Sequence, residues 1–245
     1  GVEIISNSET FSNLKILNLY HNKITDAGAN AIAGSDTLTQ LTELNLNYNL
    51  ITGLGAIELT RSKKLRQLHK IELAYNPIEK SGKRAWKRFQ MMEWFKDLHR
   101  NNRLNQVGEG LIGDFGVMVL LDFPFVSELE TLDLKNNGLT DEAVIALSQS
   151  KRLNSLVSLN LSQNNITDAG AQALGRSQNF ERLKILNLNF NRIGDEGARA
   201  IAESSRLVNL ESLKLGQNKI GTEGARALNE SENLINLVHP IFGFY

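Results

Sequence analysis

A repeat of 27 residues constrains this chain more than any other feature. Seven copies share the pattern Leu-x-x-Leu-x-Leu-x-x-Asn, with isoleucine replacing the second leucine once, and begin at Leu14, Leu41, Leu68, Leu129, Leu156, Leu183 and Leu210. Residues 1–13 match the second half of a unit, and residues 237–245 begin a further one. Repeats of this length indicate a solenoid, because one unit cannot bury its apolar side alone and must stack on its neighbours.

One unit is degenerate and follows an insertion. Leu68 and Leu129 are 61 residues apart, which is two periods plus seven residues. We therefore expect about eight units from Leu14, with a seven-residue insertion near 95–101 and a degenerate unit over 102–128. The insertion predicts a lengthened helix across 86–98, followed by a poorly formed strand near 104–107.

The degenerate unit contains a glycine pattern that resembles a phosphate-binding loop. Gly108, Gly110 and Gly113 have the G-x-G-x-x-G spacing of a dinucleotide-binding turn. However, Ile112–Gly116 falls on Ile193–Gly197 in the repeat register, and the segment before the glycines is a poor strand, which the dinucleotide motif requires. We interpret the pattern as part of the repeat and predict no cofactor.

Each unit divides into a short strand, a turn and a helix. Side chains around Leu17 and Leu19 alternate with a period of two, which is typical of a strand with one buried face. The recurring asparagines are expected in the turn, where their amides can bond unpaired main-chain groups. They are Asn22, Asn49, Asn76, Asn137, Asn164, Asn191 and Asn218. The aspartate of segments such as Thr167–Gly170 is predicted to cap the helix that follows.

These elements predict one α/β domain over residues 1–245. A strand and a helix in each period give a parallel sheet with helical crossovers. The expected fold is a right-handed solenoid with the strands on its concave face and the helices on its convex face. We expect one continuous sheet of about nine or ten strands, at most one per unit.

The repeat resembles the leucine-rich repeat, in the ribonuclease-inhibitor-like subclass. The resemblance lies in Leu-x-x-Leu-x-Leu-x-x-Asn-x-Ile followed by Asp-x-Gly-Ala-x-Ala-Leu, and it covers nearly the whole chain. Units of that subclass are usually longer and often carry cysteine where this chain has asparagine. The uniform 27-residue unit is more similar to bacterial, effector-type members. The resemblance implies protein binding on the concave face, and it implies no catalytic residue.

Composition excludes several kinds of chemistry. Lysine plus arginine equals aspartate plus glutamate, 27 each, which argues against a general nucleic-acid binder. The chain has no cysteine, and its four histidines lie outside any recognisable metal or nucleophile motif. No apolar run approaches the roughly 20 residues of a membrane helix. We predict neither an enzyme nor a metal site.

A basic aromatic segment, residues 80–103, exceeds the repeat pattern. It carries eight lysines and arginines against two acidic residues, together with Trp86, Phe89, Trp94 and Phe95. The favoured interpretation is a lengthened convex helix whose aromatic residues cover a mismatch beside the degenerate unit. Contact with a partner or a membrane surface is the less favoured alternative, because the apolar residues spread around the helical wheel.

The candidate binding site lies on the outward side of the strands. Aromatic residues there form two groups, one containing Tyr20, His21, Tyr48 and Tyr75 and the other Phe190, and tyrosine is a common interface anchor. The predicted partner-binding residues are Asn18, Tyr20, His21, Asn45, Asn47, Tyr48, Lys70, Glu72, Tyr75 and Phe190. The alternatives are that the rings merely shield the turns or that His21, Tyr48 and Tyr75 point inward.

Three functions fit these observations. The first is a protein-interaction scaffold, and its narrower form is a bacterial effector that acts in a bacterial or host cytosol rather than embedded in a membrane. The second is the targeting or regulatory part of a larger enzyme, and the third is a structural surface protein. The chain begins at Gly1 rather than methionine, as expected of a trimmed fragment.

Overall fold

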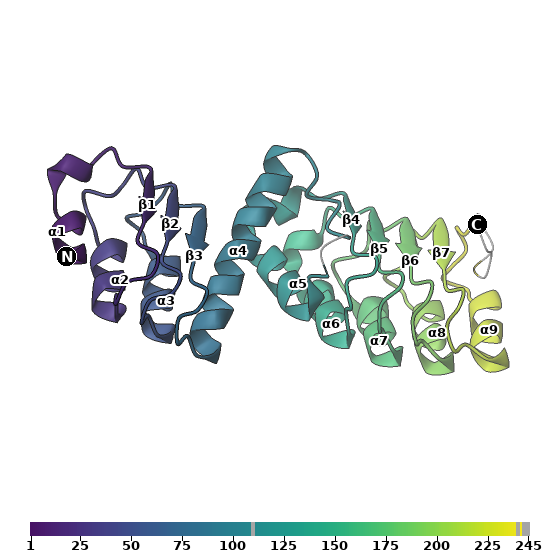
Figure 1. Cartoon of the computed structure of the whole chain (residues 1–245). Coiled ribbons are helices and arrows are strands. Elements are labelled where there is room, and N and C mark those ends of the chain that lie inside the picture. Colours follow the sequence, from purple (N-terminus) through teal and green to yellow (C-terminus); the bar gives the residue numbers. More distant parts are fainter. Residues whose placement is uncertain (109–110, 239–240, 242–245) are drawn as a thin grey trace. The chain divides into compact units, whose positions relative to one another are not determined.

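A computed structural model describes residues 1–108, 111–238 and 241. The chain divides into two compact units, Gly1–Trp94 and Phe95–Tyr245, called unit 1 and unit 2 below. In each unit the strands form one layer and the helices the other, as the α/β repeat predicts (Figure 1). That the units act as a single domain stays a prediction.

Unit 1 holds the first three strands. The order is α1 (Val2–Ser6), η1 (Glu9–Phe11), β1 (Ile16–Asn18), α2 (Asp26–Ala33), β2 (Glu43–Asn45), α3 (Gly53–Arg61) and β3 (Lys70–Glu72). The strands are parallel, and Ile16 pairs with Glu43, which pairs with Lys70. Each partner lies 27 residues further on, so the sequence period is also the register of the sheet.

Unit 2 holds the other four strands. The order is α5 (Gly113–Asp122), η2 (Pro124–Glu128), β4 (Thr131–Asp133), α6 (Asp141–Gln149), η3 (Lys151–Leu153), β5 (Ser158–Asn160), α7 (Asp168–Arg176), β6 (Ile185–Asn187), α8 (Asp195–Ala202), β7 (Ser212–Lys214) and α9 (Thr222–Asn229). The sheet order β4-β5-β6-β7 is parallel and keeps the same register.

The expectation of one continuous sheet of nine or ten strands is wrong for the described residues. They form seven strands in two sheets, with the break between β3 and β4. The degenerate unit contributes only an isolated bridge between Gln106 and Asp133. Leu104 and Val107 are nevertheless buried, so the segment keeps its place in the core without completing the ladder.

The lengthened helix is α4 (Lys80–Arg100), which confirms the helix predicted across 86–98. The indole N–H of Trp86 donates to the carbonyl of Ile71 at 2.9 Å, and Trp86 and Phe89 pack on the core of unit 1. Phe95 is fully buried in unit 2, where its ring centroid lies 6.2 Å from that of Phe123. Three of the helix's aromatic residues therefore serve the two cores, as the covering interpretation requires.

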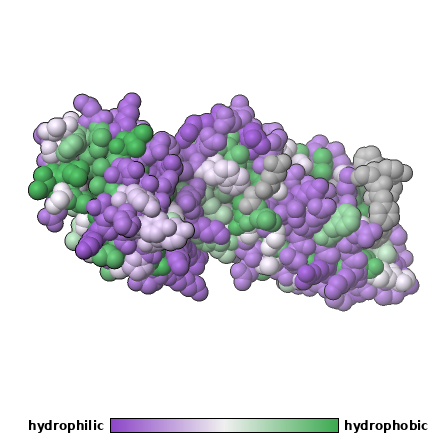
Figure 2. Space-filling model, in the orientation of Figure 1, coloured by the Kyte–Doolittle hydropathy of each residue, from purple (hydrophilic) through white to green (hydrophobic). Residues whose placement is uncertain are grey.

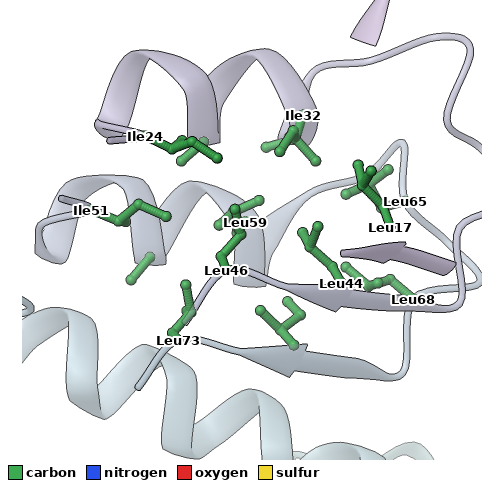
Figure 3. Close-up of a cluster of buried hydrophobic side chains, with 14 of the residues drawn as sticks. Leu17, Ile24, Ile32, Leu44, Leu46, Ile51, Leu59, Leu65, Leu68 and Leu73 are labelled. Atoms are coloured by element: carbon green, nitrogen blue, oxygen red, sulfur yellow. The ribbon is translucent and has the colours of Figure 1, made fainter. Parts of the chain in front are cut away.

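The core of unit 1 is a column of leucine and isoleucine side chains between the layers (Figure 3). Leu44, Leu46 and Ile51 of the second repeat are at most 1% exposed, while the matching Leu17 and Ile24 of the first repeat are 8% exposed. Burying such a side chain contributes roughly 1.5–3 kcal/mol. The core of an interior repeat is therefore better covered than that of the repeat at the N-terminal end of unit 1.

The asparagine ladder is structural, as predicted. The amide of Asn164 donates to the carbonyls of Leu134, Leu161 and Ser162. Its oxygen accepts from the main-chain N–H groups of Asn137 and Leu139, in the preceding repeat. The equivalent Asn49 bonds to Leu46 of its own repeat and to Leu19 and Ile24 of the preceding repeat. Asn49 and Asn164 thus each close their own turn and tie two successive repeats together. Asn22 of the first repeat differs, because it is exposed and its amide donates to Leu19 and Tyr20 of its own repeat.

The prediction that the aspartates cap their helices is wrong. The N-cap residue is the preceding threonine or glycine, such as Thr167, and Asp168 is the first helical residue. The carboxylate of Asp168 instead accepts from the N–H groups of Gly194 and Gly197 at the start of the next helix, at 2.6 and 3.0 Å. The aspartate thus satisfies N–H groups at the start of the helix in the next repeat, where a negative charge also suits the helix dipole.

The segment of the glycine pattern keeps the contacts of the repeat, although Gly113 has a φ of 61° where the equivalent Gly194 has −103°. Helix α5 begins at Gly113, and the carboxylate of Asp114 accepts from the N–H and hydroxyl of Thr140, as Asp141 does from Thr167. Gly116 is buried in the helix, as is Gly197 in α8. Gly110 lies outside the described residues.

Candidate functional site

One residue in each regular unit turns the chain out of its strand in a left-handed conformation. These turn residues are His21, Tyr48 and Tyr75 in unit 1 and Asn136, Gln163, Phe190 and Gln217 in unit 2, with φ between 53° and 59°. The N–H of Tyr48 donates to the carbonyl of Ala74 at 3.0 Å, and Gln163 donates in the same way to Asn189. The repeat therefore fixes the left-handed backbone, and residue type is free to vary on it.

In unit 1 the turn residues and Tyr20 form an aromatic cluster, defined as Tyr20, His21, Tyr48 and Tyr75. The rings of Tyr48 and Tyr75 are stacked, with centroids 4.1 Å apart and planes at 14°. Tyr20 meets Tyr48 edge-on at 5.3 Å, and His21 lies 5.9 Å from Tyr20 and 6.1 Å from Tyr48. The structure thus brings together four predicted site residues that are up to 55 positions apart, from 20 to 75.

The rings of the cluster face solvent rather than the core. Tyr20 is 50% exposed, Tyr48 38% and Tyr75 72%. The alternative that His21, Tyr48 and Tyr75 point inward is wrong, because the left-handed turn directs them outward while the leucines before them are buried. A hydrogen bond with Tyr75 raises the pKa of Tyr48, and desolvation by the neighbouring rings adds to this effect.

The polar predicted residues lie beside the cluster on the strands. The oxygens of Asn18 and Asn45 accept from the N–H groups of Tyr20 and Asn47, and the amide of Asn47 donates to Glu72 at 3.1 Å. Asn18 and Asn45 thus hold the main chain at the turns that carry the aromatic rings. A shallow depression of about 140 Å³ is lined by Ile16, Asn18, Glu43, Leu44, Asn45, Lys70 and Glu72.

The charges in this depression are paired. The ammonium group of Lys70 lies 3.1 Å from Glu72 and 3.3 Å from Glu43. The hydrogen bonds to Glu72 and then Glu43 raise the pKa of Lys70, so it stays charged between them. The depression offers mixed polarity without an unpaired cation.

Hydrophobic residues gather at the N-terminal end of unit 1, beside this face (Figure 2). Ile4 and Ile16 are 73% and 61% exposed there. Ile16 also lines the depression, so apolar surface continues from the end of the unit onto the strands.

Phe190 belongs to unit 2. It occupies the same turn position as Tyr48 and is 50% exposed. Its neighbours at the equivalent position are the amides Gln163 and Gln217 rather than tyrosines.

A second depression, of about 510 Å³, lies on the strands of unit 2. It is lined by Arg103, Gln106, Gly108, Asp133, Lys135, Asn136 and Gln163. The sequence did not indicate it as a site. Lys135, Asn136 and Gln163 follow their strands at regular repeat positions, but nothing in the pattern associates Arg103, just after the insertion, with them.

Two further properties concern only the part of the chain that the structure describes. That part contains no group of three or more histidine, cysteine, aspartate or glutamate side chains placed to hold a metal ion. None of its helices combines the length and apolar character needed to cross a membrane.

Two family models match the chain. The model described as "Leucine Rich repeats (2 copies)" matches residues 12–58, and that described as "Leucine Rich repeat" matches residues 128–148, 152–175, 183–202 and 207–228. Together they cover more than half of the sequence. No curated protein matches it.

Similar solved structures include two internalins of Listeria monocytogenes. The internalin inlF structure is 22% identical, with 97% of this chain and 56% of that one covered and a TM-score of 0.30. The internalin C2 structure is also 22% identical, with 94% and 81% covered and the same TM-score. The chain thus spans little more than half the length of the inlF structure.

Proposed function

Since this chain belongs to the leucine-rich repeat family, whose domains are generally protein-interaction scaffolds, we propose that it binds a protein partner through the aromatic cluster of unit 1. In the solenoid this surface is the concave face. The partner contacts Tyr20, His21, Tyr48 and Tyr75, and the strand residues Asn18, Asn45, Asn47, Lys70 and Glu72 form the polar surroundings.

The observation that carries the proposal is the presence of exposed aromatic residues on a left-handed backbone. A left-handed conformation costs an L-residue roughly 1–2 kcal/mol, and glycine or asparagine tolerates it best. Tyr48 and Tyr75 occupy it at φ of 55° and 57° while remaining 38% and 72% exposed. Exposed tyrosines at two successive turns, where unit 2 carries glutamines, support a role for these rings in binding beyond the packing of one ring on the other.

The surroundings of the cluster have the anatomy of an interface. A centre of aromatic side chains with a polar rim is typical of protein contact surfaces, and a few aromatic anchors supply most of the affinity. The stacked pair of Tyr48 and Tyr75 orders the anchor before binding. Binding then costs less side-chain entropy, because these two rings are already held against each other.

The test compares three forms of the whole chain as bait in quantitative affinity capture. Tyr48→Ala with Tyr75→Ala should lose specific partners more than tenfold, about 1.4 kcal/mol or more. The matched control is Gln217→Ala, which truncates the same turn position in unit 2 and lies outside the depression lined by Gln163. We expect the control to retain what the unaltered chain captures.

Two outcomes would count against the proposal. Equal capture by the tyrosine variant and the unaltered chain would remove the cluster from the interface. Loss of the circular dichroism signal of the fold in the tyrosine variant would assign the rings a structural role instead. Assignment to the ribonuclease-inhibitor-like subclass, to an effector role and to a host or bacterial cytosol stays a prediction from the sequence pattern.

A further inference from the structure

The depression at the start of the unit 2 sheet is a second candidate binding site, independent of the aromatic cluster. Its volume of about 510 Å³ is within the range of ligand pockets in proteins. We call it the β4 cleft and define it by Arg103, Gln106, Gly108, Asp133, Lys135, Asn136 and Gln163.

The cleft exists because the degenerate unit supplies little to the strand face. Gly108 stands in the row that carries Tyr20, Asn47 and Lys135 in other units, so no side chain fills that position. The segment before it pairs with β4 through a single bridge, Gln106 to Asp133. A hollow therefore remains where an interior unit would present a filled row.

The cations of the cleft have no partner within the described part of the chain. Neither Arg103 nor Lys135 makes an ion pair or a side-chain hydrogen bond there, and both side chains are exposed. Asp133 is the acidic group of the cleft, and its Oδ1 accepts from the main-chain N–H of Lys135 at 2.8 Å. Lys70 in unit 1 shows the contrast, because two carboxylates neutralise it.

The remaining side chains of the cleft add hydrogen-bond donors. The amides of Gln106, Asn136 and Gln163 also have no side-chain bond among the described residues, and all three are exposed. A group with several acceptor oxygens satisfies such a set best, and an arginine fork matches a carboxylate in two parallel bonds.

We propose that the β4 cleft binds an acidic peptide segment, with a carboxylate held by Arg103 and Lys135 and its backbone contacted by the amides. A phosphate group would share the same donors. We favour the carboxylate because Arg103 and Lys135 exceed Asp133 by one positive charge, which a group of a single negative charge neutralises and a phosphate of nearly two exceeds.

The experiment is an NMR titration of the whole chain with acetyl-Glu-Asp-Glu-amide, using acetyl-Gln-Asn-Gln-amide as the neutral probe. The acidic probe should give saturable shifts of the amides of Gln106, Lys135, Asn136 and Gln163, which weaken as salt is added. Arg103→Gln and Lys135→Gln should each lower the affinity about tenfold, the loss expected of a charge-assisted hydrogen bond. Lys214→Gln, which removes a lysine from β7 outside the cleft, should leave the affinity unchanged.

Three results would overturn the proposal. They are equal binding of the neutral probe, an equal loss of affinity in Lys214→Gln, and shifts that persist unchanged in Arg103→Gln with Lys135→Gln. A phosphoserine probe that binds more than tenfold more tightly than the acidic one would refute the carboxylate as the ligand. Arg103 and Lys135 are exposed, Lys214 is half-buried, and none of the three side chains has a hydrogen bond or ion pair among the described residues, so an unchanged thermal melt is expected throughout.

Discussion

The two units share one backbone and differ in what they place on it. At the same left-handed turn, unit 1 carries histidine and two tyrosines, and unit 2 carries asparagine, two glutamines and one phenylalanine. The amides of unit 2 suit a solvated turn, whereas the rings of unit 1 stack on each other. The repeat thus separates two tasks, since buried leucines and asparagines build the turn and the outward residue defines the surface.

The strand faces of the units differ in charge as well. Lys70 lies between two carboxylates in unit 1, while Arg103 and Lys135 share a cleft with one carboxylate in unit 2. Under the two proposals above, the first surface recognises shape and aromatic contact, and the second recognises charge.

The largest expected effect tests the part that the units share. Asn49→Ala in unit 1 and Asn164→Ala in unit 2 should each lower the free energy of unfolding by about 1–3 kcal/mol, because buried main-chain groups lose their partners. Asn164→Ala should cost more, since its oxygen accepts from Asn137 and Leu139 while that of Asn49 accepts from Ile24. Denaturant titration followed by circular dichroism measures both.

Asn165→Ala is the control for the ladder. Asn165 is adjacent to Asn164 but has no side-chain hydrogen bond among the described residues, so its loss should change stability by less than about 0.5 kcal/mol. If Asn164→Ala is no more harmful than Asn165→Ala, the asparagine ladder does not stabilise the stack, and the shared framework of the two units fails as an explanation.

Most of the fold follows from the sequence because the period is encoded redundantly. The seven regular repeats carry the same leucines and asparagine, so the register of 27 residues could be predicted. The seven extra residues between Leu68 and Leu129 predicted the lengthened helix. The poorly formed strand near 104–107 was also predicted and is confirmed. That the sheet breaks completely there was not predicted, because Leu104 and Val107 are as apolar and as buried as strand residues. What they lack is main-chain pairing, which side-chain patterns do not report.

The candidate site was predictable in its residues but not in its geometry. Spacing places Tyr48 and Tyr75 one unit apart, and hence one strand apart. The direction of their rings depends on φ, and tyrosine gives no signal for a left-handed turn because it rarely adopts one. The role of Asp168 was missed for a similar reason, since its bonds reach residues 26 and 29 positions away, in the next unit.

Glycine substitutions at the turn separate what the ring stack contributes to the free energy of unfolding from what the backbone contributes. Tyr48→Gly and Gln163→Gly remove side chains from turn residues with φ of 55° and 59°, so the backbone terms of the two changes nearly cancel. Tyr48→Gly also loses its contact with Tyr75, and an aromatic pair contributes about 0.5–1.5 kcal/mol. Tyr48→Gly should therefore be the less stable variant by about 1 kcal/mol in parallel denaturant titrations. Equal stabilities would show that the stack of unit 1 adds nothing to folding.

The smallest expected effect is a titration confined to unit 1, where the cluster holds its three tyrosines. The hydrogen bond with Tyr75 raises the pKa of Tyr48 above the ordinary value of 10.0, so the folded chain retains that proton longer than the unfolded chain does. The resulting stabilisation is complete below the ordinary pKa and is lost as the pH rises through the raised one. Tyr75→Phe should return the pKa of Tyr48 toward its ordinary value, as followed by the Cζ chemical shift of labelled tyrosine. Tyr20→Phe should lower it less, because the charge interaction with Tyr20 is the smallest of the causes that raise the pKa of Tyr48. Equal effects of the two substitutions would place the cause in general crowding of the rings and remove the hydrogen bond between Tyr48 and Tyr75 from the account of the cluster.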